Sequence, residues 1–243
     1  MPQTVTPEIL RDLAPTGVLR AAINFGNAVL AQRDAATGEP RGVSVDLARD
    51  LGKLLGVEVR LVTFEAAGKV FEALKSAAWD VAFLAVDPAR ATEIIFTEPY
   101  VVIEGTYMVR DDSPLKCVAD VDRAGIRVAA AAGSAYELFL SRTLKAAQIV
   151  RKPTGVEAFE AFIGEGLDAM GSVRQICQQF ARTHSGLRIM DDSFMTIRQA
   201  MGTPRPREAG ARFLSAFIDE RKKNGFVAAG LQRSGQTDAT VAP

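Results

Sequence analysis

The 243-residue sequence contains few of the residues that build metal sites and disulfide frameworks. It has two cysteines, Cys117 and Cys177, and a single histidine, His184. The cysteines lie far apart without Cys-x-x-Cys spacing, and one imidazole cannot complete a Cys/His ligand set without carboxylates. We therefore expect neither a disulfide framework nor a bound metal, and no cofactor.

An excess of charge and long apolar runs are also absent. The 29 Lys and Arg residues balance the 29 Asp and Glu residues, so the net charge favours neither nucleic acid nor an anionic membrane as a partner. No stretch approaches the roughly 18 apolar residues of a membrane span, and residues 1–20 lack the apolar core of a signal peptide. We expect no nucleic-acid partner and no membrane insertion. The sequence does not decide between a cytoplasmic protein and one whose signal peptide was removed.

The common catalytic motifs are missing as well. The sequence has no G-x-S-x-G elbow, no P-loop and no G-x-G-x-x-G, which argues against nucleophilic hydrolysis, ATP binding and dinucleotide binding. A Ser/His/Asp set would have to recruit His184, which falls in a predicted loop between a helix and a strand. Nothing beside Cys177 except Arg174 would activate its thiol.

Apolar, β-branched runs alternate with amphipathic stretches, a pattern typical of α/β units around mostly parallel sheets. With 48% hydrophobic residues, the chain can bury one large core or two medium ones. The predicted strands are residues 18–24, 57–64, 80–86, 126–131, 167–171 and 187–190. The predicted helices are residues 44–55, 67–77, 134–145, 156–162, 174–183, 207–224 and 227–233.

Two long extended runs, 101–110 and 194–201, flank the part of the chain that begins with the polar segment 111–114. This arrangement favours two α/β lobes joined by two crossings over one continuous sheet. We predict that lobe 1 contains residues 1–107 and 197–243, and that lobe 2 contains residues 108–196.

Two positions are candidates for binding an anion. Arg90 follows an apolar strand at its carboxyl end, where open α/β sheets bind ligands, and its guanidinium can hold a carboxylate through two hydrogen bonds. The alternative is a surface ion pair with Asp87 or Glu93. Ser134 follows Gly133 at a predicted helix N-terminus, where free N–H groups favour an anion. The alternative there is a simple helix cap.

Several segments together resemble the family 3 solute-binding proteins of ABC transporters, the class that captures polar amino acids. They are VLRAAIN, GEPRGVSVDLARDLGKLLGV, FEALKSAAWDVAFLAVDPARATEIIFTEPY, ADVDRAGIRVAAAAGSAYE and EGLDAM. The FT-x-PY run, with an arginine six residues before the phenylalanine, is the most specific of these. The resemblance implies an α/β, two-lobed type II periplasmic-binding-protein fold with two hinge crossings that encloses a ligand by hinge closure. It also implies a monomeric, non-enzymatic protein in the periplasm with an ABC transporter permease as partner.

The resemblance assigns roles residue by residue. Arg90 matches the arginine that grips the ligand α-carboxylate, and Ser134 with the N–H of Ala135 matches the opposing contact. Val173 stands where the family has an aspartate that binds the ligand ammonium, and Arg174 is next to it. The remaining candidate ligand-binding residues are Asn24, Phe25 and Asn27 after the first strand, Phe83 and Ala85 in place of small hydroxyl residues, Lys69, and Glu104.

These departures predict a ligand that differs from the common α-amino acids. A buried ammonium needs a carboxylate or several acceptors, and Val173 provides neither. We expect a small carboxylate-bearing metabolite, such as a dicarboxylate, a hydroxy acid or an aromatic acid packed on Phe25 or Phe83, unless Glu104 or Asp87 turns inward. The alternatives are a soluble sensor and an enzyme that resembles cyclohexadienyl dehydratases, with Glu104 or Lys69 as the general acid or base.

Overall fold

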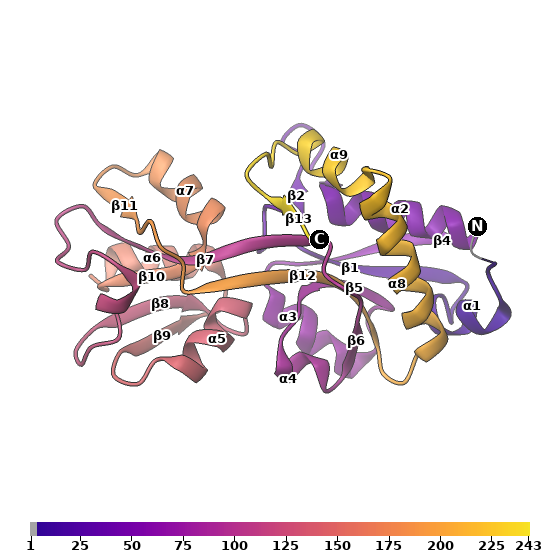
Figure 1. Cartoon of the computed structure of the whole chain (residues 1–243), viewed down its shortest axis with the longest axis horizontal. Coiled ribbons are helices and arrows are strands. Elements are labelled where there is room, and N and C mark those ends of the chain that lie inside the picture. The colour runs from indigo at the N-terminus through magenta and orange to yellow at the C-terminus, as the bar shows by residue number, and fades with distance from the viewer. Residues whose placement is uncertain (1–3) are drawn as a thin grey trace. The chain divides into compact units, whose positions relative to one another are not determined.

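The computed structural model describes residues 4–243, and contacts within the chain divide it into two compact units. Unit 1 contains the described residues up to Val102 together with Arg198–Pro243, and unit 2 contains Ile103–Ile197. The chain leaves unit 1 within strand β7 (Val101–Arg110) and returns within strand β12 (Met195–Pro204), as the colours in Figure 1 show.

Unit 1 is built around a mostly parallel set of strands. Strand β1 (Val18–Asn24) pairs in parallel with β4 (Glu58–Phe64) and with β5 (Val81–Ala85). Strand β12 pairs antiparallel with β5 and with the short β6 (Ile94–Phe96). All five residues of β5 are buried, which suits a strand with partners on both sides and helices over its faces.

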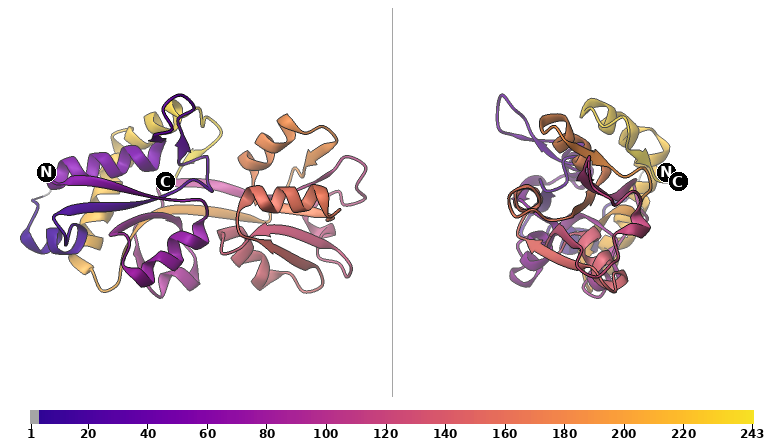
Figure 2. Two further views of the ribbon diagram at one scale, coloured as in Figure 1. Left: turned by 180° about the vertical axis from the view of Figure 1, so that it is seen from behind. Right: turned by 90° about the vertical axis from the view of Figure 1, so that its left-hand side faces the viewer.

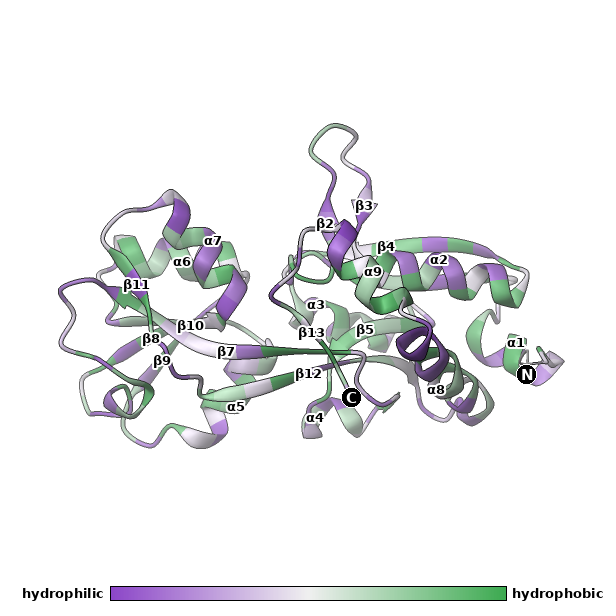
Figure 3. Cartoon of the chain, turned by 45° about the horizontal axis from the view of Figure 1, so that its top comes forward, coloured by the Kyte–Doolittle hydropathy of each residue, from purple (hydrophilic) through white to green (hydrophobic). Residues whose placement is uncertain are grey.

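Helices cover both faces of these strands. In unit 1 they are α1 (Pro7–Leu13), α2 (Val43–Leu55), α3 (Ala67–Glu72), α4 (Pro88–Ala91), α8 (Glu208–Lys223) and α9 (Phe226–Arg233), with a 3-10 turn at Ala73–Ser76. Helices α2 and α3 both contact β1 and β4, and Figures 1 and 2 show them on opposite faces of the sheet. Strands β2 (Gln32–Arg33) and β3 (Pro40–Arg41) form a separate hairpin with hydrophilic strands that extends from unit 1 (Figure 3).

A buried carboxylate links three elements of unit 1. Asp80, which precedes β5, is 0% exposed and accepts hydrogen bonds from Arg20 on β1 at 2.8 Å and from Arg207 at the start of α8 at 2.9 Å. The Asp80 hydrogen bond raises the pKa of Arg20, although partial burial of the guanidinium opposes the shift. One anion thus holds two cations from distant parts of the sequence.

The sheet of unit 2 has the order β7, β10, β8, β9. Strand β10 (Ala169–Val173) pairs antiparallel with β7 and in parallel with β8 (Arg127–Ala131), which in turn pairs in parallel with β9 (Gln148–Lys152). Strand β11 (Leu187–Ile189) pairs with the end of β7.

The helices of unit 2 pack on opposite faces of its sheet. They are α5 (Ala135–Thr143), α6 (Gly155–Gly164) and α7 (Arg174–Thr183), with a 3-10 turn at Val118–Asp120. Met108 belongs to a core cluster with residues of α6 and α7, whereas the adjacent Tyr107 belongs to a cluster with residues of α5. Because neighbouring strand residues point to opposite faces, the sheet separates two cores.

The last strand of the chain also pairs with a crossing strand. In β13 (Thr240–Val241), the two residues pair antiparallel with Val102 and Val101 of β7. Ala242 donates its N–H to the carbonyl oxygen of Tyr100 at 3.1 Å, and the Lys222 ammonium donates to the carbonyl oxygen of Pro243 at 2.7 Å. No helix among residues 4–243 combines the length and the apolar character that crossing a membrane requires.

Most predicted elements appear in the structure, with three kinds of difference. The predicted strand 167–171 is displaced by two residues, to Ala169–Val173, and the predicted helix 67–77 changes to a 3-10 turn after Glu72. Strand β9 and helix α1 were not predicted. The preference for two lobes joined by two crossings over one continuous sheet is wrong as regards the sheet, because β12 and β7 are neighbours in a single strand order.

Candidate functional site

Arg90 lies in the short helix α4, directly after β5. Asp87 caps this helix by accepting the N–H of Ala89 at 2.9 Å. Arg90 is only 1% exposed, and its guanidinium donates to the carbonyl oxygen of Ala85 at 2.9 Å. Burial lowers the pKa of Arg90 to about 10, and the negative charge of Asp87 partly opposes this. The guanidinium therefore stays charged at neutral pH. Arg90 and Asp87 are both buried, so an ion pair between them would lie inside the protein and not on its surface.

Two further candidate residues, Phe83 and Ala85 on β5, are also buried. The Phe83 ring meets the edge of Tyr100 at a centroid distance of 6.2 Å and an interplanar angle of 86°. The Tyr100 hydroxyl in turn shares a hydrogen bond with Ser44 at 3.1 Å. Phe83 and Ala85 thus give the end of β5 near Arg90 an apolar character.

The loop after β1 contains polar groups with different surroundings. Asn24 accepts the N–H of Gly26 through its side chain at 3.0 Å, and the guanidinium of Arg33 lies 4.1 Å from the centroid of the Phe25 ring. Asn27 is buried, and its side-chain oxygen has no hydrogen-bond partner within the described part of the chain. Lys69 is exposed on α3.

In unit 2, Ser134 caps the N-terminus of α5. Its hydroxyl oxygen accepts the N–H of Glu137 at 3.1 Å, so the cap is present as predicted. The buried carboxylate of Glu137 accepts the N–H of Gly133 at 3.0 Å and receives hydrogen bonds from Ser141 at 2.6 Å and Arg151 at 2.8 Å. Ser134 and the adjacent Ala135 are buried at this helix end.

Two polar residues beside Ser134 were missed by sequence reasoning. Burial raises the pKa of Tyr136, while its hydrogen bonds with Ser172 and Ser134 oppose the increase. Ser172 is a buried hydroxyl residue in β10 between Gly171 and Val173, and a hydroxyl in an otherwise apolar strand is the feature that would have identified it. Ser134, Tyr136 and Ser172 thus form a hydroxyl cluster at the start of α5.

The structure brings Glu104 and Arg174 together within unit 2. The guanidinium of Arg174 donates to the Glu104 carboxylate at 2.7 Å and to the carbonyl oxygens of Met190 and Asp191, each at 2.9 Å. Glu104 therefore balances the charge of Arg174, and the guanidinium ties α7 to the segment after β11. Val173 is buried at the end of β10.

The nucleophile candidates are in environments that do not activate them. Cys177 is buried, and this raises the pKa of its thiol to about 12, even though Arg174 opposes the shift. His184 is exposed, packs against the edge of Phe159 at a centroid distance of 4.7 Å, and lies 3.0 Å from the Thr183 hydroxyl. A thiol in this state is protonated at neutral pH.

The chain is similar to solved structures of amino-acid-binding proteins. A mutant of ArgBP from T. maritima has a TM-score of 0.80 at 20% identity, covering 93% of this chain and 99% of that one. A substrate-binding protein of an amino acid ABC transporter from Streptococcus pneumoniae, bound to L-arginine, has a TM-score of 0.79 at 17% identity, covering 96% and 99%.

A third similar structure belongs to an ancestral protein. The ancestral amino acid-binding protein AncCDT-1, described as a precursor of cyclohexadienyl dehydratase, has a TM-score of 0.77 at 21% identity, covering 92% and 98%. At these identities the likeness shows the fold, which is the expected two-lobed type II periplasmic-binding-protein fold. Residues 27–233 match the model of a family of transport proteins, so the chain belongs to the bacterial extracellular solute-binding proteins, family 3.

Proposed function

We propose that this solute-binding protein captures a small metabolite through a carboxylate that Arg90 holds. The buried guanidinium at the end of β5 is the observation that carries the proposal. A planar guanidinium donates two parallel hydrogen bonds to a carboxylate, and this interaction strengthens where water is excluded. Ser134 and the N–H of Ala135 are the proposed second contact with the same ligand, because a helix N-terminus favours an anion.

The second part of the proposal concerns the rest of the ligand. The side-chain oxygen of Asn27 is a buried acceptor without a partner among residues 4–243, and such an atom costs free energy until a donor reaches it. Asn24 and Asn27 are neutral, Val173 is apolar, and Glu104 already binds Arg174. These groups suit a hydroxyl or amide donor better than a free ammonium. We therefore propose hydroxy acids, including hydroxylated dicarboxylates, as the ligand class, not arginine or lysine.

A thermal-shift screen over organic acids and the twenty amino acids tests the ligand class. A ligand present at about 100 times its Kd should raise the free energy of unfolding by about 2.7 kcal/mol. Hydroxy acids, including hydroxylated dicarboxylates, are expected to stabilise the protein. Micromolar binding of a neutral or basic amino acid, measured by calorimetry, would show that this ligand class is wrong.

Arg90 variants test the anchor with whichever acid binds. Arg90→Ala is expected to weaken binding at least about 30-fold, because it removes a buried charge partner of the carboxylate. Arg90→Lys, which keeps the charge but not the planar fork, should weaken binding less. Circular dichroism checks that both variants are folded. Unchanged affinity in Arg90→Ala would reject the role of Arg90.

We further propose that the protein acts without catalysis, as a monomer in the periplasm, and delivers its ligand to an ABC transporter permease. The family supports delivery to a transporter, and Glu104, one of the two candidates for a general acid or base, is held in an ion pair with Arg174. Light scattering should give the mass of one chain with and without ligand. The name of the AncCDT-1 structure motivates a test of the enzyme alternative, in which conversion of prephenate-like acids would contradict the proposal.

A further inference from the structure

A cavity of about 330 Å³ opens in unit 2, and neither Ser134 nor Arg174 is among the residues that line it. Its walls come from β7, from the segment 118–122, from the second half of α5 and from the residues just before β12. The volume is within the range of small-molecule sites in proteins, about 300–1,000 Å³. All lining residues belong to unit 2, so the cavity is a feature of this unit alone.

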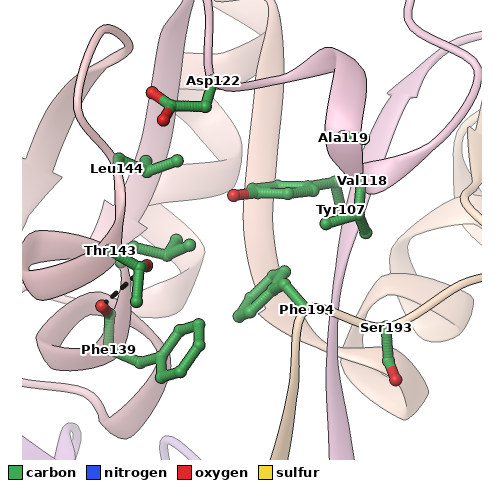
Figure 4. A pocket seen from close by; sticks show the side chains of 10 residues that line it. Tyr107, Val118, Ala119, Asp122, Phe139, Thr143, Leu144, Ser193 and Phe194 are labelled. Carbon is green, nitrogen blue, oxygen red and sulfur yellow. Dashed lines mark hydrogen bonds between the residues drawn. The ribbon is translucent and has the colours of Figure 1, made fainter.

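Three aromatic rings form one side of the cavity. The ring centroids of Tyr107 and Phe194 lie 4.7 Å apart, and those of Phe139 and Phe194 lie 6.0 Å apart with an interplanar angle of 18°. Leu144 lies opposite Phe194 in Figure 4. Aromatic faces of this kind bind apolar groups and also attract cations.

The hydroxyl of Tyr107 points into the cavity (Figure 4). Tyr107 is 1% exposed as a residue, but its hydroxyl is not among the fully buried side-chain atoms that lack a partner, as expected for an oxygen that faces the cavity. A hydroxyl at the wall of a cavity can donate a hydrogen bond to a ligand there or accept one from it. The ligand should therefore present a hydrogen-bonding group to this hydroxyl.

A carboxylate lies at the same end of the cavity. Asp122 accepts the backbone N–H groups of Lys145, Ala146 and Ala147 at 2.9, 2.7 and 3.0 Å, and these hydrogen bonds lower its pKa. Burial raises the pKa of Tyr107, and the charge of Asp122 raises it further. At neutral pH the end of the cavity thus has a negative carboxylate and a protonated phenol.

We propose that this cavity binds a small organic amine with an aromatic or aliphatic body. The ammonium lies between the Asp122 carboxylate and the Tyr107 hydroxyl, which accepts one of its hydrogen bonds. The body packs against Phe139, Phe194 and Leu144. This site is independent of Arg90 and of the acid proposed as the transported ligand.

Titrating the full chain with three matched compounds, monitored by two-dimensional NMR, tests the proposal. The compounds are 2-phenylethylamine, 2-phenylethanol and phenylacetate, which share the aromatic body and differ in charge. The amine should shift the amide signals of the lining residues and bind most tightly, and phenylacetate should bind most weakly. No shifts at these residues, or phenylacetate binding as tightly as the amine, would overturn the proposal.

Two variants separate the polar contacts. Tyr107→Phe keeps the ring and removes only the hydroxyl, so it should weaken the amine about 5-fold. Asp122→Asn keeps an oxygen for the backbone N–H groups and removes the charge, so it should abolish the preference for the amine over the alcohol. Tyr100→Phe is the matched control, because it removes a buried phenol hydroxyl in unit 1 and should leave the amine affinity unchanged. Unchanged amine affinity in Tyr107→Phe would overturn the proposal even if Asp122→Asn failed to fold.

Discussion

At the residue scale, the buried carboxylate of Asp80 is important for stability because it is paired with two arginines. It binds Arg20 and Arg207, whose side chains are 19% and 20% exposed. Removing one partner of a buried ion pair leaves the others uncompensated, which is more costly than losing an exposed pair. The stability that Asp80 contributes therefore depends on the carboxylate and on both arginines.

We predict that Asp80→Asn lowers the free energy of unfolding by about 3 kcal/mol, because it removes the anion shared by two arginines. Urea denaturation should show a lower midpoint with an unchanged slope. Asp34→Asn is the control, since Asp34 forms an exposed pair with Arg41 at 4.0 Å and should change stability by less than about 1 kcal/mol. Equal midpoints for the two variants would contradict the prediction.

Residues that are adjacent in a motif were easier to predict than residues that meet across the fold. Arg90 follows a strand, and Ser134 caps a helix with Glu137 three positions later, so local spacing identified both. Asp80 is 60 residues from Arg20 and 127 from Arg207, and nothing in the local sequence connects them. The ligand roles of Arg90 and Ser134 stay predictions.

At the element scale, the start of helix α2 depends on a close backbone approach. Gly42 precedes the helix with a φ of 116°, and a Cβ there would lie 2.4 Å from the carbonyl oxygen of Leu30. The same carbonyl accepts the N–H of Ser44 at 3.1 Å. A side chain at Gly42 would therefore strain the backbone and displace this hydrogen bond.

We predict that Gly42→Ala destabilises the protein by about 2 kcal/mol, through backbone strain and the clash with Leu30. Gly38→Ala is the matched control, because Gly38 has a φ of 72° and no atom within 4 Å of the added Cβ. Thermal denaturation should show a larger decrease in Tm for Gly42→Ala. Equal decreases in Tm for the two variants would contradict the predicted clash with Leu30, because the positive φ alone would then explain the loss of stability.

Elements with clear periodicity were predicted closely, whereas those that depend on tertiary contacts were not. The strand at 18–24, the run at 101–110 and the helix at 174–183 agree with β1, β7 and α7. Strand β10 contains Gly171 and Ser172, residue types that favour strands only weakly. The buried Leu167 precedes the strand, and its apolar side chain led to a predicted start two residues too early. Strand β9 is too polar to be recognised without its partner β8.

At the scale of the whole molecule, the end of the chain supports the strand by which the chain leaves unit 1. We predict that removing residues 239–243 lowers Tm and speeds amide exchange at Val101–Val102, because it removes strand β13 and the carbonyl that Lys222 contacts. Lys222→Met is the control and should have a smaller effect, since it leaves β13 intact. Exchange at Val101–Val102 that is unchanged by the truncation would contradict this role of β13.

Because the chain is synthesised from its N-terminus, the two units acquire all of their strands at different times. Unit 2 is one uninterrupted segment, whereas unit 1 needs residues from both ends of the sequence. Until Gln199–Gly202 has been synthesised, strand β5 lacks its β12 partner and presents an apolar edge, which is prone to aggregation. Unit 2 can therefore form from its own segment, but unit 1 must wait until strand β12 is available. A chaperone that shields Val81–Ala85 would protect the nascent protein during that interval.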